Sequence, residues 1–223
     1  RLFLRRFGIS PKQYIIKQRL NKAVKLLVSA ERYGNAFYHA FANLTPQISD
    51  GEIIVGEAVR PIPEEYAAEW KEKYEKISYK GAQQAGDGQD SHMAIDYDLL
   101  LSKGIQGIIK TIDEYLLACA EEKKAFYKCC KRCLQAIIKH SENYADLALK
   151  MSTETDDPIR KRELMKIGEI CRKVPAQPAG SFYEAVQSVH FITHCLSLYP
   201  FRLGFQQYQL GHPDRYLLRF YEE

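Results

Sequence analysis

Helical spacing of apolar residues dominates the second half of this sequence and constrains the fold more than any other feature. Between Tyr97 and Leu198, apolar residues recur at intervals of three and four, which is typical of amphipathic helices. Gly104, the turn 155–158 and the connector 174–180 interrupt this pattern. The sequence therefore predicts a mainly α-helical fold, with helices over about 96–102, from Gly104 to about 120, 121–152, 159–173 and 182–198.

Residues that start or stop helices occur where this pattern changes. Ser181 stands where it would cap helix 182–198, which is apolar on nearly all sides, so we expect a buried helix. Earlier in the chain, residues 30–44 predict a helix. The segment 48–57 predicts a turn followed by a short buried strand.

Length and composition fit a soluble globular protein of one large or two small domains. The 223 residues are 46% hydrophobic and 27% charged, so the chain can bury a core without metals or disulfides. The net charge of +4 is too small to imply nucleic acid by itself. No segment has the length of a transmembrane helix, and the start is charged too early for a signal peptide. Six cysteines without regular spacing predict a cytoplasmic protein with reduced thiols.

The first 28 residues carry a motif of their own. Phe7-Gly8-Ile9-Ser10-Pro11, followed by Arg19-Leu20, resembles the end of an AraC-type transcription activator. The resemblance implies that residues 1–28 are the C-terminal remnant of a helix-turn-helix domain. The base-reading residues of such a domain would precede Arg1, because they lie near the start of a recognition helix. The cations implied to reach DNA phosphates are Arg5, Arg6, Lys12 and Lys17. The alternative is an amphipathic helix pair with a solvated basic face.

Residues 30–223 contain a second series of motifs. They are Ile48-Ser-Asp-Gly-Glu-Ile-Ile-Val-Gly56-Glu57, Ser91-His92-Met-Ala-Ile-Asp96-Tyr97 with Lys103-Gly104, Tyr144–Ala148, Arg160–Leu164, Cys171–Ala176, Phe182–Phe191 and Leu210–Tyr216. Their order resembles the N-terminal part of the glycyl radical enzymes, the family of pyruvate formate-lyase and glycerol dehydratase. The resemblance implies the helical N-terminal part of an α/β barrel, with one or two short strands.

In that family, a backbone glycyl radical takes hydrogen from a cysteine, and the resulting thiyl radical attacks the substrate. Both residues follow the segment that this chain resembles, so we expect no catalytic residue here and no activity from the chain alone. The resemblance implies cleavage of a C–C, C–O or C–N bond in a small polar substrate. It also implies a radical-SAM activating enzyme that installs the radical, a homodimer in the full-length form, and no organic cofactor in this chain.

The resemblance also implies substrate-binding residues. His92 matches a histidine that reaches substrate hydroxyl or carboxylate groups, a role suited to a side chain that donates or accepts at neutral pH. Gln206 and Gln207 match a loop that approaches the substrate. The alternative for His92 is a loop histidine bonded to the backbone, and we expect Asp96 and Tyr97 to be structural.

Other combinations of residues are weaker candidates. Cys130 and Cys133 have the spacing of half a zinc site, but no second pair follows. His190 and His194 lack the glutamate of a metalloprotease helix, so we expect both to be core residues and no metal to be bound. Two alternatives to a partial enzyme remain open. One is a DNA-binding regulator fused to an enzyme-derived domain, and the other is a non-functional product of gene rearrangement.

Overall fold

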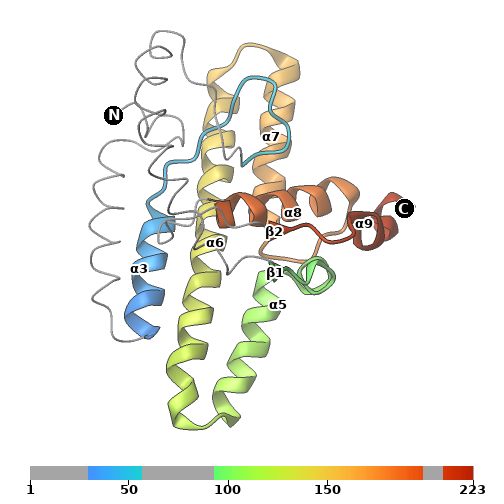
Figure 1. Cartoon of the computed structure of the whole chain (residues 1–223). Coiled ribbons are helices and arrows are strands. Elements are labelled where there is room, and N and C mark those ends of the chain that lie inside the picture. Colours follow the sequence, from blue (N-terminus) through green and yellow to red (C-terminus); the bar gives the residue numbers. More distant parts are fainter. Residues whose placement is uncertain (1–29, 57–92, 198–207, 223) are drawn as a thin grey trace, which may run out of the picture.

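The computed structural model describes residues 30–56, 93–197 and 208–222 of the chain, and these residues are mostly helical (Figure 1). This confirms the mainly α-helical prediction. The helices are α3 (Ala30–Ala42), α5 (Tyr97–Ala118), α6 (Glu121–Glu154), α7 (Pro158–Lys173), α8 (Phe182–Ser197) and α9 (Pro213–Tyr221). Two strands of two residues each, β1 (Met93–Ala94) and β2 (Tyr208–Gln209), form a parallel pair.

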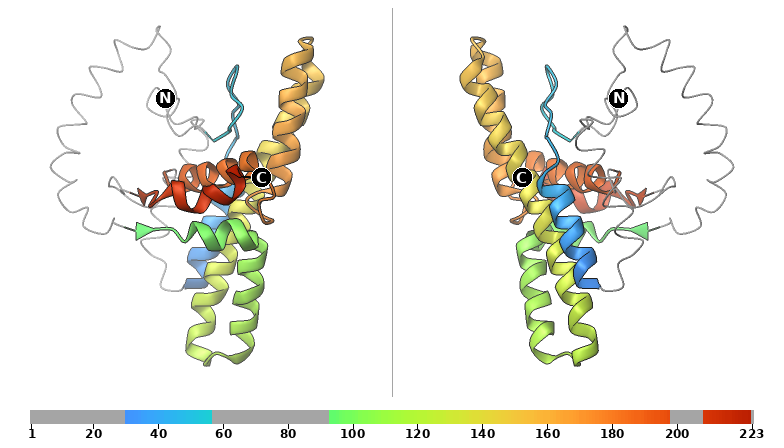
Figure 2. Two further views of the ribbon diagram at one scale, coloured as in Figure 1. Left: turned by 90° about the vertical axis from the view of Figure 1, so that its right-hand side faces the viewer. Right: turned by 90° about the vertical axis from the view of Figure 1, so that its left-hand side faces the viewer.

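Helix α6 is the central element of the described part. Its 34 residues make it about 50 Å long, because an α-helix rises 1.5 Å per residue. It packs against α3, against α5 near its beginning and against α7 near its end. Figures 1 and 2 show α8 crossing the middle of this assembly, and the α5–α6 hairpin projecting away from it.

Two apolar clusters fill the spaces between the helices. The first joins α3, α6, α7 and α8 and includes Phe41, Tyr144 and Phe191. The second joins α5, α8 and α9 and includes Ile105 and Phe220. Helix α8 contributes to both clusters, which confirms that its inner positions are buried. The prediction of burial on nearly all sides is wrong at Phe182 and His190, which are exposed to solvent on the outer side of α8.

The helix starts follow from local capping. The side chain of Asp157 accepts a hydrogen bond from the Ile159 amide at 2.8 Å, and Pro158 occupies the first turn of α7. Asp96 caps α5 in the same way through the Leu99 amide at 2.9 Å. The Ser181 hydroxyl accepts from the Glu184 amide at 3.3 Å at the start of α8, as predicted.

Gly104 interrupts α5, as the sequence predicts. Its φ of 63° and ψ of 170° belong to a backbone region that is almost restricted to glycine. The break frees the amides of Ile105 and Gln106, which donate to the carbonyl oxygens of Pro175 and Ala176 at 2.9 Å each. The connector that follows α7 therefore fits into the gap in α5.

A side chain at position 104 would not fit against this connector. A Cβ placed there would lie 2.4 Å from the carbonyl carbon of Gln177 and 2.5 Å from the carbonyl oxygen of Ala176. The Ala179 amide also donates to the Leu101 carbonyl at 3.1 Å. The glycine is required here for its backbone conformation and for this close approach.

The strand predicted within 48–57 is wrong for the described residues 48–56, which form turns and irregular structure. Val55 is fully buried, as predicted, but neither of the described strands pairs with it. Its backbone pairs instead with the side chain of Gln187 on α8. The segment 1–28, with the predicted phosphate-contacting residues Arg5, Arg6, Lys12 and Lys17, lies outside the described residues. Among the described helices, none is both long and apolar enough to cross a membrane.

Candidate functional site

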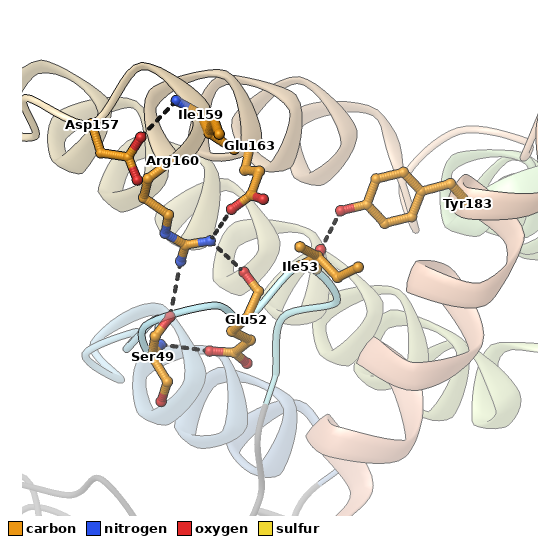
Figure 3. Close-up of polar contacts among 8 residues, drawn as sticks. All are labelled: Ser49, Glu52, Ile53, Asp157, Ile159, Arg160, Glu163 and Tyr183. Atoms are coloured by element: carbon orange, nitrogen blue, oxygen red, sulfur yellow. Dashed lines mark hydrogen bonds and ion pairs between the residues drawn. The ribbon is translucent and has the colours of Figure 1, made fainter.

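The segment 48–56 is held on α7 by a single arginine (Figure 3). The guanidinium of Arg160 donates from Nη2 to the Ser49 carbonyl at 2.8 Å and from Nη1 to the Glu52 carbonyl at 2.9 Å. Nη1 also lies 2.9 Å from the carboxylate of Glu163. Because the planar guanidinium has several donors in fixed directions, one side chain can hold two carbonyl groups of the segment at once.

Tyr183 on α8 holds the other side of this segment. Its hydroxyl donates to the Ile53 carbonyl (Figure 3). Burial raises the pKa of Tyr183 to about 12, so the hydroxyl keeps its proton at neutral pH and remains a donor. Between the two anchors, the Ser49 amide donates to the Glu52 carboxylate at 2.7 Å, which closes the turn.

Gln187 fixes the end of the segment inside the protein. Its Nε2 donates to the Val55 carbonyl at 2.8 Å, and its Oε1 accepts from the Val55 amide at 2.9 Å. Both residues are buried, so the amide side chain satisfies two backbone groups that have no access to water. The side chain of Gln187 therefore makes the two hydrogen bonds to the Val55 backbone that a neighbouring β-strand would otherwise make.

Three motifs that are far apart in the sequence therefore meet in one place. They are the segment 48–56, the start of α7 and the first half of α8. Each of these side chains bonds to backbone groups of the segment 48–56 and so fixes the path of its chain. The role of these motif residues in the described structure is architectural, and it leaves Ile53 half exposed at the surface.

The β1–β2 pair is the part of the structure next to the predicted substrate-binding residues. His92, Gln206 and Gln207 themselves lie outside the described residues. Met93, which directly follows His92 in the sequence, is the register partner of Tyr208, which directly follows Gln207. Since the strands are parallel, the chain enters both strands from the same side of the pair.

Tyr97 and Tyr216 pack together beside this strand pair. Their ring centroids are 4.9 Å apart, and both side chains are buried. The Tyr97 hydroxyl is 3.3 Å from the Thr193 hydroxyl, and the Tyr216 hydroxyl donates to the Leu210 carbonyl at 2.9 Å. Both tyrosines are structural here, in agreement with the expectation for Tyr97.

A cluster of buried aromatic and histidine rings lies where α3, α6 and α8 meet. His140 stacks on His194 with ring centroids 5.7 Å apart, and its ring also contacts Phe41, Tyr144 and Phe191. Neither ring nitrogen of His140 has a hydrogen-bond partner among the described residues. Burial lowers the pKa of His140 to about 4, so the ring is neutral at pH 7.

The sequence predicts core positions for both His190 and His194. The structure confirms this for His194, whose Nε2 is 3.4 Å from the Tyr144 hydroxyl. It is wrong for His190, which is exposed. Sequence reasoning missed His140, because a single histidine on a long amphipathic helix gives no signal of its own.

The cysteines do not form a metal site in the described part of the chain, where no group of three or more metal-ligating side chains converges. Cys171 and Cys195 are buried, and desolvation raises the pKa of both thiols, to about 12 for Cys171. Burial likewise raises the pKa of Cys133, to about 12. The thiols are therefore protonated at neutral pH and poorly reactive as nucleophiles.

Solved structures of glycyl radical enzymes share this arrangement of helices. The hydroxyproline dehydratase of Clostridioides difficile matches with a TM-score of 0.73 and 21% identity, over 96% of this chain and 34% of that chain. A glycyl radical enzyme of Archaeoglobus fulgidus matches with a TM-score of 0.69 and 24% identity, over 93% of this chain and 34% of that one. The fold is therefore that of part of a glycyl radical enzyme.

Sequence comparison gives the family. The model of the family described as pyruvate formate lyase-like matches residues 59–223. The isethionate sulfite-lyase of Bilophila wadsworthia (strain 3_1_6) is 33% identical over 135 residues, which are 57% of this chain and 16% of that protein. The probable dehydratase YbiW of Escherichia coli (strain K12) is 29% identical over 138 residues, 59% of this chain and 17% of that protein. The chain belongs to the pyruvate formate lyase-like family, and it covers about a sixth of the length of these relatives.

Proposed function

We propose that residues 30–223 are the helical N-terminal part of a glycyl radical enzyme of the dehydratase or lyase type. In this role the chain supplies the helical scaffold at the start of an α/β barrel and one wall of the substrate pocket. The complete enzyme would cleave a C–C, C–O or C–N bond by radical chemistry. The match of residues 59–223 to the pyruvate formate lyase-like family supports this class of radical bond cleavage.

The observation that carries the proposal is the register of β1 and β2. Met93 is the register partner of Tyr208 in this parallel pair. In the sequence, His92 directly precedes Met93 and Gln207 directly precedes Tyr208. We propose that His92, Gln206 and Gln207 bind the substrate together at this side of the strand pair. An imidazole and two amides can each donate or accept a hydrogen bond, which suits hydroxyl and carboxylate groups.

The names of the relatives are consistent with a small polar substrate. One matching protein is an isethionate sulfite-lyase, and others are dehydratases of (2S)-3-sulfopropanediol and of trans-4-hydroxy-L-proline. We propose a substrate of this class for the complete enzyme, small and bearing a hydroxyl or an anionic group.

We assign no catalytic residue to this chain. Cys171 and Cys195 are buried within the helical assembly, where their thiols stay protonated at neutral pH. The reacting cysteine and the radical glycine would then belong to the remainder of the enzyme. A radical-SAM activating enzyme would install the radical, a second copy would complete a homodimer, and the chain would hold no organic cofactor.

A chimeric enzyme tests this proposal. The N-terminal segment of the Bilophila wadsworthia isethionate sulfite-lyase is replaced by residues 30–223 of this chain, and the product is activated under anaerobic conditions. Radical content is measured by electron paramagnetic resonance and turnover by product release. We expect His92→Ala to lower kcat/KM by roughly 10–100-fold, the effect of losing a hydrogen bond to a charged or reacting group, at unchanged radical content.

The matched control is Gln177→Ala, at an exposed position of the connector. It should change neither radical content nor turnover. If His92→Ala behaves like this control in both kcat and KM, then His92 does not contact the substrate, and the proposed pocket wall is wrong.

For residues 1–28 we propose a remnant of an AraC-type helix-turn-helix domain, on the strength of the Phe7–Pro11 motif alone. In this proposal Arg5, Arg6, Lys12 and Lys17 contact DNA phosphates without reading the sequence. Titration with duplex DNA at increasing salt should then give weak binding that is lost as salt rises and does not depend on sequence. Sequence-specific binding would instead favour a working regulator fused to an enzyme-derived domain.

A further inference from the structure

The β1–β2 pair is too short to hold its own register. Each strand has only two residues, Met93–Ala94 and Tyr208–Gln209. Strands of globular proteins usually have about five or six residues, and even then an isolated pair of strands is at best marginally stable in water. A slip of one residue would turn every side chain of a strand to the other face. Contacts beyond these four residues therefore have to hold β1 against β2.

Tyr97 fixes the chain where it leaves β1. This residue begins α5, is 2% exposed, and its amide donates to the Ile95 carbonyl at 2.9 Å. Its hydroxyl lies 3.3 Å from that of Thr193, which itself donates to the Val189 carbonyl at 3.0 Å. A threonine hydroxyl has one hydrogen, so the Tyr97 hydroxyl is the donor to Thr193. This bond ties the exit of β1 to α8.

Tyr216 fixes the chain where it leaves β2. The residue lies on α9 and is buried, and its hydroxyl donates to the Leu210 carbonyl at 2.9 Å. Burial raises the pKa of Tyr216 to about 12, so the hydroxyl keeps its proton at neutral pH and remains a donor. The bond therefore closes the short connection between β2 and α9 (Figure 1).

The two tyrosine rings join these exits to each other. The centroids of the Tyr97 and Tyr216 rings are 4.9 Å apart, with the rings tilted by 32°, and both rings belong to the apolar cluster between α5, α8 and α9. Aromatic pairs at this separation add stability beyond the area that they bury. We call the two tyrosines and their hydrogen-bond partners, Thr193 and Leu210, the tyrosine clamp.

The clamp leaves little slack in either strand. Two residues separate Ala94 from Tyr97, and Leu210 directly follows Gln209. A slip of one residue would move a strand by about 3.3 Å along its own direction. Such a movement would break the hydrogen bonds of the clamp, which are lost beyond about 3.5 Å. The clamp therefore holds the register in which Met93 pairs with Tyr208.

We propose that Tyr97 and Tyr216 are positioning residues for substrate binding, and that they act through His92. The inference rests on the proposed function, in which His92, Gln206 and Gln207 bind the substrate as the chain enters β1 and β2. Because the strands are parallel, both chains enter on one side of the pair and leave on the other, where the clamp lies. Holding the exits sets where the entering residues stand. A displacement of about 1 Å in such a group can lower the rate about 100-fold.

Replacing tyrosine with phenylalanine tests the clamp, because each ring stays and only its hydroxyl is lost. The test variants are Tyr97→Phe and Tyr216→Phe. The matched control is Tyr183→Phe, which also loses a hydroxyl that donates to a backbone carbonyl, that of Ile53, but lies outside the clamp. Hydrogen exchange of the whole chain, measured by mass spectrometry, follows the peptides that contain β1 and β2. We expect exchange there to quicken by roughly two- to ten-fold in both test variants, the effect of one lost hydrogen bond, and to stay unchanged in the control.

The chimeric enzyme separates positioning from stability. The value of kcat/KM for isethionate is measured with Tyr216→Phe, with His92→Ala and with both changes together. We expect Tyr216→Phe alone to lower kcat/KM by roughly three- to ten-fold at unchanged radical content. In the His92→Ala background the same change should have an effect of less than about two-fold, since no histidine is left to position. Tyr183→Phe should leave kcat/KM unchanged.

Three results would overturn the inference. The first is exchange at β1 and β2 that is no faster in the test variants than in Tyr183→Phe. The second is an equal loss of kcat/KM from Tyr216→Phe with and without His92, which would mean that the tyrosine does not act through the histidine. The third is unchanged kcat/KM in Tyr216→Phe. If His92→Ala lowers kcat/KM while any of these results is found, only the inference fails. If His92→Ala has no effect, the proposed pocket wall is wrong and the inference falls with it.

Discussion

Replacing Gly104 with alanine is expected to break the contact between α5 and the connector that follows α7. The backbone at Gly104 lies in a region that costs a non-glycine residue about 1–3 kcal/mol. The added Cβ would lie 2.4–2.7 Å from backbone atoms of Ala176 and Gln177, which cannot turn aside as a flexible side chain can. The connector would therefore have to move.

Moving the connector removes three hydrogen bonds. The amides of Ile105, Gln106 and Ala179 lose the carbonyl oxygens of Pro175, Ala176 and Leu101. At about 1 kcal/mol net for each bond, this adds about 3 kcal/mol to the backbone strain. Alanine restricts the unfolded chain and so returns about 0.4–1 kcal/mol. We expect Gly104→Ala to lower the free energy of unfolding by about 3–6 kcal/mol.

Gly51→Ala is the matched control, because Gly51 also has a positive φ, of 73°, but apart from its chain neighbours no described residue has an atom within 4 Å of the added Cβ. It should cost only the backbone strain of a left-handed residue, about 1–2 kcal/mol. Urea unfolding followed by circular dichroism measures both variants, and hydrogen exchange at Ile105 and Gln106 locates the change. If Gly104→Ala loses no more stability than Gly51→Ala, the close approach of the connector does not stabilise the fold.

Three further predictions concern single buried or half-buried side chains. Gln187→Leu keeps the side-chain volume but leaves the buried amide and carbonyl of Val55 without the Gln187 partner. This should lower the free energy of unfolding in denaturant by about 2–5 kcal/mol, and an unchanged midpoint of unfolding would contradict it. Arg160→Lys should speed limited proteolysis within 48–56, since one ammonium group cannot replace the fork that holds two carbonyls, and an unchanged cleavage rate would count against the anchor. His140 has a folded pKa of about 4, below its ordinary 6.5, so it binds protons more readily when unfolded; stability should be full above pH 6.5 and fall by about 3 kcal/mol as the pH drops to 4. His140→Phe should remove that part of the pH dependence in thermal unfolding, and an identical pH profile would refute the assignment.

The helices were predictable because the residues that start and interrupt them act over a short stretch of the chain. Asp157-Pro158, Ser181 and Gly104 act within a few residues of their own position, and the structure confirms each of the predicted starts and breaks. The mainly α-helical fold follows from the same periodicity. The predicted substrate-binding residues, His92, Gln206 and Gln207, remain predictions.

Long-range partners could not be read from the sequence. The segment 48–56 has the apolar residues of a strand, but nothing near it in the chain shows that Gln187 takes the place of a neighbouring strand. The same limit applies to α8, where periodicity alone placed both His190 and His194 in the core. Which side of α8 is covered depends on α5, α6, α7 and α9, and these leave His190 exposed.

The distance along the chain between the segment 48–56 and its anchors has a consequence for synthesis on the ribosome. Arg160 follows Ser49 by 111 residues, and Gln187 follows Val55 by 132. At a translation rate of roughly 5–20 residues per second, Val55 leaves the ribosome about 7–26 s before Gln187 does. For most of that interval the apolar side chains of Ile48 and Val55 have no native partner on α7 or α8, because α7 begins only at Pro158. A chaperone that binds short apolar segments could occupy this part of the nascent chain until α8 emerges.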